Sequence, residues 1–460
     1  MTENEVFTAT SFQKFAYAIA TFGNALVGAV VTVFTFFYYK NVVYEEAFFL
    51  AKEPIILTLL GTTLAIGWWV QGIMNPVAGW LSDKFVSARF GRRKPWLILG
   101  SPIVGVSFIG MFLVPTGQTE LYFPIIWLSI FSVIYNAAYA ATVCVYLAII
   151  PEICQTPEER TSISTYRQGF YLVGTILGAL LGALVEAQAF VVFVLAGFSV
   201  VLFYIAAFGI KEPEEVPEVP TFGIFEALRV TLSNKPFLPY LGYTVFMAAF
   251  QAMMLGMLPD FGRHVIFKGV GVDEGGIEST ISSFLPGAFV ITGIIAIIPA
   301  MYWINRIGKK NAALYAMFAI AIIASTLVTV GLIPGFELPL TLIIVLTLGF
   351  PAAPLLILPD SIISDITDYD EMVTGTRREA MHFASQGLLT HFARGLAVQL
   401  MGIILGVFGA TYTEGASFNN TLGLLLIGPI AGLCAIIGVL IFRKYPEEEV
   451  LVASAKKLGG

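Results

Sequence analysis

The stretch GWLSDKFVSARFGRRKPW, residues 79–96, gathers five cations between Lys84 and Lys94, with one acid, Asp83, just before them. Long apolar runs lie on both sides of it. Lys and Arg accumulate in the cytoplasmic loops of membrane proteins. The stretch is therefore interpreted as a cytoplasmic turn between two membrane-spanning helices, and it anchors the predicted topology of the whole chain.

The composition excludes a water-soluble globular protein. Of the 460 residues, 57% are hydrophobic and 12% are charged, whereas about 25% of the residues in a soluble protein are charged. The mean hydropathy is +0.84. Because the apolar runs are about 20 residues or longer and do not alternate, they predict spanning helices rather than barrel strands. The expected fold class is an all-α membrane protein.

Twelve apolar runs can be marked, six on each side of an acidic, proline-rich segment at 211–220. They cover about 12–39, 54–82, 95–114, 121–150, 166–186, 188–210, 236–260, 280–304, 311–333, 338–366, 379–410 and 421–442. Two sets of six predict twelve transmembrane helices in two pseudo-symmetric six-helix bundles. The expected domains are an N-terminal bundle (1–210), a cytoplasmic central loop with a short amphipathic helix (211–235), a C-terminal bundle (236–442) and a cytoplasmic tail (443–460).

The cations are distributed unequally between the two sides of the predicted membrane. Of the 25 Lys and Arg residues, 18 fall on the side of the opening stretch: Lys84, Arg89, Arg92, Arg93, Lys94, Arg160, Lys211, Arg229, Lys235, Arg306, Lys309, Lys310, Arg377, Arg378, Arg443, Lys444, Lys456 and Lys457. Only Lys40, Lys52, Arg263 and Lys268 fall opposite. This asymmetry predicts a multi-pass protein of the cell membrane with both termini in the cytoplasm.

A shorter copy of the opening stretch, WINRIGKKN at 303–311, follows the second helix of the other half. Both copies end in Gly and basic residues, which indicates that the two halves share one ancestry and rock against each other. Residues 83–94 then have two interpretations. They are a topology anchor only, or they also belong to a gate in which paired charges close the cytoplasmic mouth.

The pattern D-K-x(4)-R-x-G-R-R-K-P in the opening stretch resembles the loop after helix two of the major facilitator superfamily. Its extended form is more similar to one branch, the glycoside–pentoside–hexuronide (melibiose permease-like) symporters. LPDSIISDITDYDEMVTGTRREA at 358–380 and PEICQTPEERTSISTYRQGF at 151–170 also resemble loops of that branch. The resemblance implies a twelve-helix transporter of sugars or glycosides that works by alternating access. The gate residues that it implies are Asp83, Arg89, Arg92, Asp368, Tyr369, Asp370, Arg377 and Arg378.

Sodium-coupled members of that family carry two aspartates on helix two, at positions that here hold Gln71 and Asn75, the latter just before Pro76. Two amides one turn apart still make a polar patch on one helical face. They lack the negative charge that offsets the dehydration of a sodium ion. The acid expected on helix one falls at Asn24 or Ala25. The resemblance therefore implies no metal site, and no sodium coupling through the usual helix-two site.

The basic members of the family's site are kept in part. Arg167 on helix five matches a sugar-contacting arginine, and His391 on helix eleven stands where relatives have a lysine, with Arg394 one turn on. Ionisable residues at membrane depth are costly unless they are paired or hydrated, so they are functional candidates. Tyr135 and Tyr139 share a face of helix four and suit a sugar ring. For each of these side chains the alternative is packing or a position nearer the membrane surface.

The leading hypothesis is a secondary transporter of a polar solute, such as a sugar, a glycoside or a hexuronide-like organic anion. An anion is favoured because no carboxylate in the middle of a predicted span balances these cations. The alternatives are a carrier of lysophospholipid-like amphiphiles and a non-transporting sensor. If a proton is co-transported, His391 is the candidate carrier. No nucleotide-binding loop is present. We expect no enzyme activity, catalytic residue, cofactor or nucleic-acid partner; the partners are a small-molecule substrate and the lipid bilayer.

Overall fold

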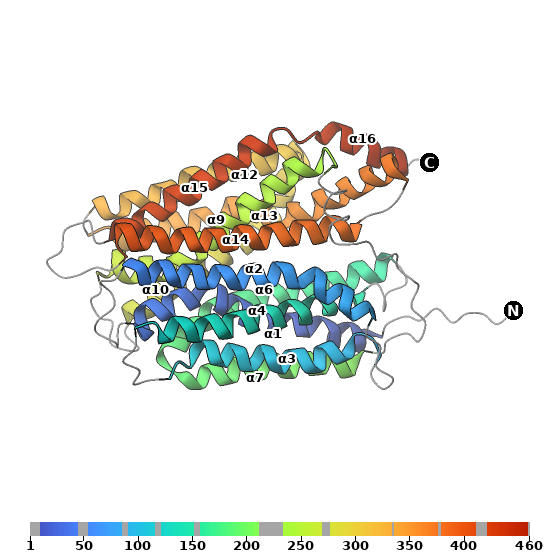
Figure 1. Cartoon of the computed structure of the whole chain (residues 1–460). Helices are drawn as coiled ribbons and strands as arrows, with labels where there is room; N and C mark the ends of the chain where they lie inside the picture. The colour runs from blue at the N-terminus through green and yellow to red at the C-terminus, as the bar shows by residue number, and fades with distance from the viewer. Residues whose placement is uncertain are drawn as a thin grey trace. The chain divides into compact units, whose positions relative to one another are not determined.

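The structure is a computed structural model of the whole chain (Figure 1). It describes residues 10–44, 54–84, 91–115, 121–150, 157–210, 233–268, 277–333, 335–375, 379–410 and 421–458. Within these ranges the regular elements are all helices, which confirms the all-α class. The amphipathic helix expected in the central loop lies outside the described residues.

The helices fall on the apolar runs of the sequence. In chain order they are α1 (Ser11–Tyr38) with the π-helix η1 (Tyr39–Val43), α2 (Pro54–Lys84), α3 (Lys94–Phe112), α4 (Phe123–Leu147), α6 (Pro157–Ala187), α7 (Ala189–Gly209), α9 (Phe237–Phe261) with the π-helix η2 (Gly262–Ile266), α10 (Ile277–Ile295), α11 (Ile297–Ile307), α12 (Lys309–Ser325) with the 3₁₀ helix η3 (Thr326–Leu332), α13 (Glu337–Thr374), α14 (Glu379–Phe408), α15 (Leu422–Phe442) and α16 (Glu447–Leu458). The last helix, α16, was not expected from the sequence.

Ten of the described helices are long and apolar enough to cross a membrane. The pair α10 and α11 is bent by 49° and makes an eleventh if it is counted as one broken span. Pro299 explains the break, because it has no N–H to donate to the carbonyl of Ile295 one turn earlier. α6 covers the run expected at 166–186 but is not among the ten. An integral membrane protein with many spans follows, while the number of twelve stays a prediction.

The chain divides into two compact units. Unit 1 comprises residues 1–48 and 66–221, and unit 2 comprises residues 49–65 and 222–460. The first turns of α2 therefore group with unit 2, and the rest of α2 groups with unit 1. The domain boundaries expected at 210 and 236 stay a prediction.

In unit 1, α6 packs against α1 through glycines spaced four residues apart, at Gly174, Gly178 and Gly182. A Cβ atom at Gly178 would clash with the Leu26 carbonyl oxygen and would lie 2.8 Å from the Ala29 Cβ. Lipid tails are as apolar as the side chains, so helix association in a membrane depends on such close backbone approach. The glycine face therefore holds α6 against α1.

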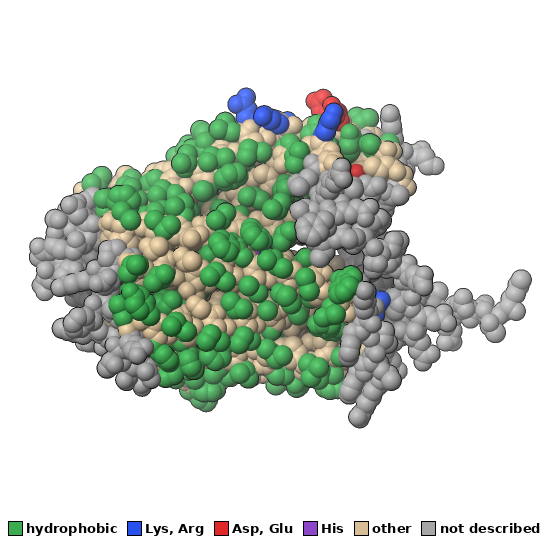
Figure 2. Space-filling model, in the orientation of Figure 1, with side chains coloured by type: hydrophobic (Ala, Val, Ile, Leu, Met, Phe, Trp, Pro, Cys, Tyr) green, Lys and Arg blue, Asp and Glu red, His purple; other side chains and the backbone are tan. Residues whose placement is uncertain are grey.

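In unit 2, α15 packs closely against α12 through glycines in the same way. A Cβ atom at Gly432 would lie 2.7 Å from the carbonyl oxygen of Ala321, and one at Gly428 would clash with that of Ala324. Away from such contacts the visible surfaces are covered by apolar side chains, with few charged groups (Figure 2). Such a surface suits contact with lipid rather than with water.

Helix α1 of unit 1 and helix α9 of unit 2 correspond to each other in sequence and structure. A constant interval of 223 residues separates Tyr17 from Tyr240, Thr21 from Thr244 and the π-helix 39–43 from the π-helix 262–266. The Tyr17 hydroxyl donates to the Tyr146 carbonyl of α4 at 3.0 Å, and the Tyr240 hydroxyl donates to the Pro359 carbonyl of α13 at 3.0 Å. In each unit, a tyrosine of the first helix thus binds the fourth span, which supports a common ancestry of the halves.

Candidate transport site

Gln71 and Asn75 lie one turn apart on α2, in the part that belongs to unit 1. Gln71 is buried, and the backbone carbonyl of the half-buried Asn75 accepts a hydrogen bond from the Cys144 thiol of α4 at 3.2 Å. α2 continues through Pro76, which leaves the carbonyl of Gly72 without its helical donor. This part of α2 therefore offers amides and a released carbonyl, but no carboxylate.

The polar face of α4 lies against α1 and α2. A Cβ atom at Gly67 of α2 would lie 2.6 Å from Asn136 Nδ2, and one at Gly28 of α1 would lie 3.1 Å from the Tyr139 hydroxyl. Asn24 is buried on α1, one turn before Gly28 and on the same face. Asn24 therefore lies on the face of α1 that meets Tyr139 of α4.

Tyr135 and Tyr139 form a ring pair on α4, with centroids 5.5 Å apart. Tyr135 is buried, and its hydroxyl has no hydrogen-bond partner among the described residues. A buried polar group without a partner costs about 1–3 kcal/mol. A hydroxyl or carboxylate of a bound solute would supply the missing partner.

Arg167 of α6 belongs to a different part of unit 1. It lies close enough to the Tyr146 hydroxyl to interact electrostatically, and its Nε has no hydrogen-bond partner among the described residues. The ring of Tyr146 stacks on that of Tyr17 at 4.3 Å, and its hydroxyl bonds to Thr21 Oγ1 at 2.7 Å. Tyr146 is about 16 Å further along α4 than Tyr135. The structure therefore places Arg167 with this tyrosine pair rather than with Tyr135.

His391 and Arg394 come together on α14 in unit 2. Both side chains are half-buried, and the Arg394 guanidinium acts electrostatically on the imidazole. They are three residues apart and share a helical face. The candidate site residues are thus divided between the units: His391 and Arg394 lie in unit 2, and Arg167, the amides and the tyrosines lie in unit 1.

The predicted gate residues are described only in part. Three of them lie outside the described residues: Arg89, Arg377 and Arg378. Asp83 lies in α2, but its side chain is not described. Asp370 is buried, and its Oδ1 accepts a hydrogen bond from Asn234 Nδ2 at 3.0 Å. Asn234 Oδ1 in turn accepts from the Phe237 N–H at 3.2 Å, at the start of α9. Asp370 therefore has a partner inside its own unit.

The remaining gate residues lie near one end of each unit. Asp368 and Tyr369 are half-buried in the last turns of α13, and Arg92 is half-buried just before α3. Beside Arg92, the Arg93 guanidinium donates to the Ser82 hydroxyl, so it joins the start of α3 to the end of α2. Sequence reasoning had not singled out this contact.

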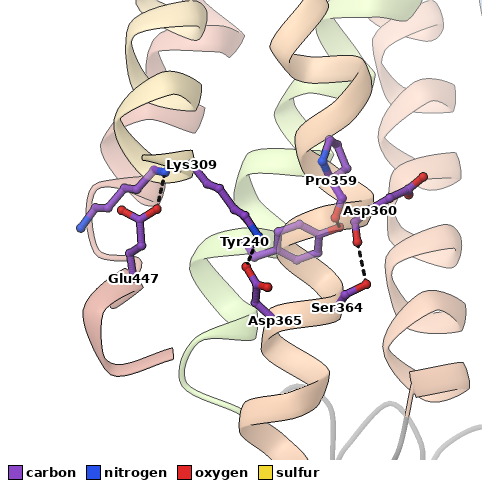
Figure 3. A network of polar contacts seen from close by, with 8 residues as sticks. Tyr240, Lys309, Pro359, Asp360, Ser364, Asp365 and Glu447 are labelled. Carbon is purple, nitrogen blue, oxygen red and sulfur yellow. Dashed lines mark hydrogen bonds and ion pairs between the residues drawn. The ribbon is translucent and has the colours of Figure 1, made fainter. Parts of the chain in front are cut away.

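The shorter copy of the opening stretch, at 303–311, makes polar contacts that join helices at one end of unit 2 (Figure 3). Lys309 Nζ lies 2.5 Å from Asp365 Oδ2 of α13, and the Lys310 N–H donates to Glu447 Oε1 of α16 at 2.9 Å. Lys310 Nζ also donates to the Tyr445 carbonyl at 2.6 Å. Burial and the carboxylates of Asp365 and Glu447 raise the pKa of Tyr445 well above its usual range, so its hydroxyl stays neutral.

Sequence reasoning singled out neither Glu447 nor α16. The signal was present, because Pro446 followed by Glu447, Glu448 and Glu449 is a typical helix start. Asp365 lies in the stretch 358–380 that resembles a family loop, but the sequence does not identify its partner. The structure shows that this partner is Lys309, from the copy of the opening stretch.

We expect the Lys309–Asp365 pair to have a modest and specific effect on stability. Both side chains are partly exposed, at 28% and 19%, so the coupling free energy should be about 0.5–1 kcal/mol. A double-mutant cycle with Lys309→Ala and Asp365→Ala, followed by denaturant unfolding in detergent, measures it. The matched cycle with Lys310→Ala and Asp365→Ala should be additive. Equal coupling in both cycles would contradict the pairing.

Comparison with known proteins agrees with this architecture. Residues 16–449 match the family described as MFS/sugar transport protein. The sodium-dependent lysophosphatidylcholine symporter 1 of Gallus gallus is 22% identical over 95% of this chain and 86% of its own length. The isoprimeverose transporter of Lactiplantibacillus pentosus is 23% identical over 95% and 89%.

Among solved structures, the D-xylose-proton symporter superposes with a TM-score of 0.64 at 16% identity, over 95% of this chain and 99% of that chain. At that identity the likeness shows a common fold. The family match covers nearly the whole chain, and it confirms the resemblance read from the loops at 79–96 and 358–380. The chain therefore belongs to the MFS/sugar transport protein family of the major facilitator superfamily.

Proposed function

We propose that the protein is a secondary transporter that moves a polar solute across the membrane by alternating access. The observation that carries the proposal is the pair His391 and Arg394, two basic side chains that interact within one spanning helix. Basic groups at membrane depth are retained where they bind a substrate or an ion. A guanidinium pairs best with a planar anion such as a carboxylate. The favoured substrates are therefore sugars, glycosides and, above all, hexuronide-like organic anions.

A carrier of lysophospholipid-like amphiphiles is the second candidate. It is supported by the similarity to the sodium-dependent lysophosphatidylcholine symporter 1. A phosphate head group would also pair with Arg394. The two candidates differ in what the rest of the ligand requires. An amphiphile also needs an apolar path for its tail, whereas a sugar does not.

Uptake into proteoliposomes distinguishes these candidates. The purified protein is reconstituted, and counterflow is measured with methyl glucuronide, with the neutral methyl glucoside and with lysophosphatidylcholine. Saturable counterflow of the glucuronide, faster than that of the glucoside, is the expected result. Transport of lysophosphatidylcholine alone would favour the amphiphile carrier. Binding of a solute without any counterflow would favour a sensor.

We expect uptake to be unchanged when sodium is replaced by choline at fixed pH. Gln71 and Asn75 are neutral amides, and they cannot offset the dehydration of a monovalent cation as two carboxylates would. The membrane potential is held constant by potassium and valinomycin in both conditions, so that only the cation differs. Strict dependence on sodium would contradict this prediction.

A co-transported proton would need a titratable group, and amides do not titrate. An imidazole exchanges protons in the physiological range, which makes His391 one candidate carrier. Accumulation driven by a pH gradient in the His391→Gln variant tests that role. Unchanged accumulation would exclude His391.

A further inference from the structure

A second group of ionisable side chains lies at the C-terminal end of α9. Tyr240 and the network around Lys309 are at the other end of this helix. Asp260 is in the last turn of α9, and Arg263 and His264 are in the π-helix η2 that follows. The three residues are 0%, 6% and 6% exposed. His264 Nε2 lies 3.8 Å from Asp260 Oδ1. That separation is within ion-pair range when the imidazole carries a proton, and is longer than a hydrogen bond.

The group is enclosed by helices of its own unit. Gly262 lets η2 approach α10, since a Cβ atom there would lie 2.6 Å from the Ser282 Cα. Ser282 itself is buried. η2 also contacts α13. Asp260 and His264 therefore sit in a packed, low-dielectric environment, where a single uncompensated charge is costly.

The charged and titratable groups of the surrounding elements can be named. On α13, Glu337 pairs at 3.0 Å with Lys268, which follows η2. α10 carries Glu278, whose side chain is not described. α14 and α15 also pack on α9, and their titratable groups nearest to mid-helix are His391, Arg394 and Cys434. On η2 itself, Arg263 adjoins His264.

Unit 1 provides an internal control for this arrangement. The interval of 223 residues relates Lys40 to Arg263, so a buried cation is present in both units. It relates Phe37 to Asp260 and Asn41 to His264. Unit 1 thus forms the same five-residue π-helix with neither an acid nor an imidazole. The Asp260–His264 pair is therefore not needed to build the turn, and π-helical turns often mark functional sites.

We propose that Asp260 and His264 form a proton-binding site in unit 2 and that this site carries the co-transported proton. The Asp260 carboxylate, 3.8 Å from the imidazole, favours its protonated form, and the adjacent Arg263 guanidinium opposes it. A proton taken from water forms an N–H bond at His264 Nε2, and the carboxylate of Asp260 then holds the imidazolium as an ion pair. Release breaks that N–H bond and returns the proton to water. The coupling role rests on the proposed transport function, whereas the binding of a proton does not.

The binding step can be tested without any substrate. The chain has three histidines, so protein labelled with ¹⁵N-histidine shows three sets of imidazole signals in nuclear magnetic resonance spectra. The signals lost in His264→Asn are those of His264. That variant copies the Asn41 of unit 1, which is compatible with the π-helix. We expect His264 to titrate between about pH 5 and 8, and Asp260→Asn to shift its midpoint by about one pH unit or more. No titration in that range, or no shift in Asp260→Asn, would overturn the site.

The coupling step is tested with methyl glucuronide, or with whichever probe of the three the wild type exchanges. In His264→Asn, accumulation driven by an inward pH gradient should be lost, while counterflow, which needs no net proton movement, stays within about twofold of wild type. His391→Gln is the matched comparison. Wild-type accumulation in His264→Asn would overturn the coupling role. If the wild type shows no counterflow of any probe, the proposed transport function fails, and the spectroscopic titration still decides whether the proton site exists.

Discussion

Replacing Gly178 with leucine should prevent stable folding, whereas the same change at Gly169 of the same helix should be tolerated. A Cβ atom at Gly178 clashes with the Leu26 carbonyl oxygen, which cannot move without displacing α1, and lies 2.8 Å from the Ala29 Cβ. At Gly169 a Cβ atom meets nothing within 4 Å. Overpacking usually costs about 1–3 kcal/mol, and a whole leucine side chain against backbone should exceed that.

The loss is large compared with the total stability of a folded protein, which is about 5–15 kcal/mol. We expect Gly178→Leu to give little monodisperse protein in size-exclusion chromatography, and thermal unfolding to occur at a much lower temperature. Gly169→Leu should unfold within a few degrees of wild type, because leucine also favours the helix over glycine by up to about 1 kcal/mol. Equal stability of the two variants would show that α6 does not pack on α1 through Gly178.

Replacing Arg394 with glutamine should lower the apparent affinity for methyl glucuronide by about 10–100-fold. A hydrogen bond to a charged group contributes about 1.5–3 kcal/mol, and about 1.4 kcal/mol corresponds to a factor of ten. Arg394→Lys keeps the charge but loses the two-pronged geometry of the guanidinium, so it should fall between wild type and glutamine. The concentration dependence of counterflow measures the change.

The neutral methyl glucoside provides the control for that experiment, because it cannot pair with a guanidinium through a carboxylate. Its affinity should change much less than that of the glucuronide. Lys309→Gln removes a positive charge from the α16 end of the same unit and should leave both affinities unchanged. Equal losses for both sugars in Arg394→Gln would mean that Arg394 positions the helix and does not bind the anion.

The positions of most membrane-spanning helices follow from the sequence alone, although α16 and the break between α10 and α11 were not predicted. In lipid each backbone N–H and C=O must be satisfied within its own helix, so an apolar run is enough to specify one. The run at 95–114 corresponds to α3 and the run at 421–442 corresponds to α15. Positions on one helix were also accessible, as the ring pair of Tyr135 and Tyr139 demonstrates, since helical periodicity is local.

Which helices meet, and which side chains become partners, depends on tertiary packing and could not be read from the sequence. Arg167 acts electrostatically on Tyr146, and Lys309 and Lys310 bind Asp365 and Glu447. Lys310 and Glu447 are 137 residues apart. Such contacts depend on close helix approach at small residues and on bonds between distant segments, which helical periodicity does not encode. The burial of Asp260 with His264 likewise follows from how α10 and α13 enclose η2, and not from hydropathy along the chain.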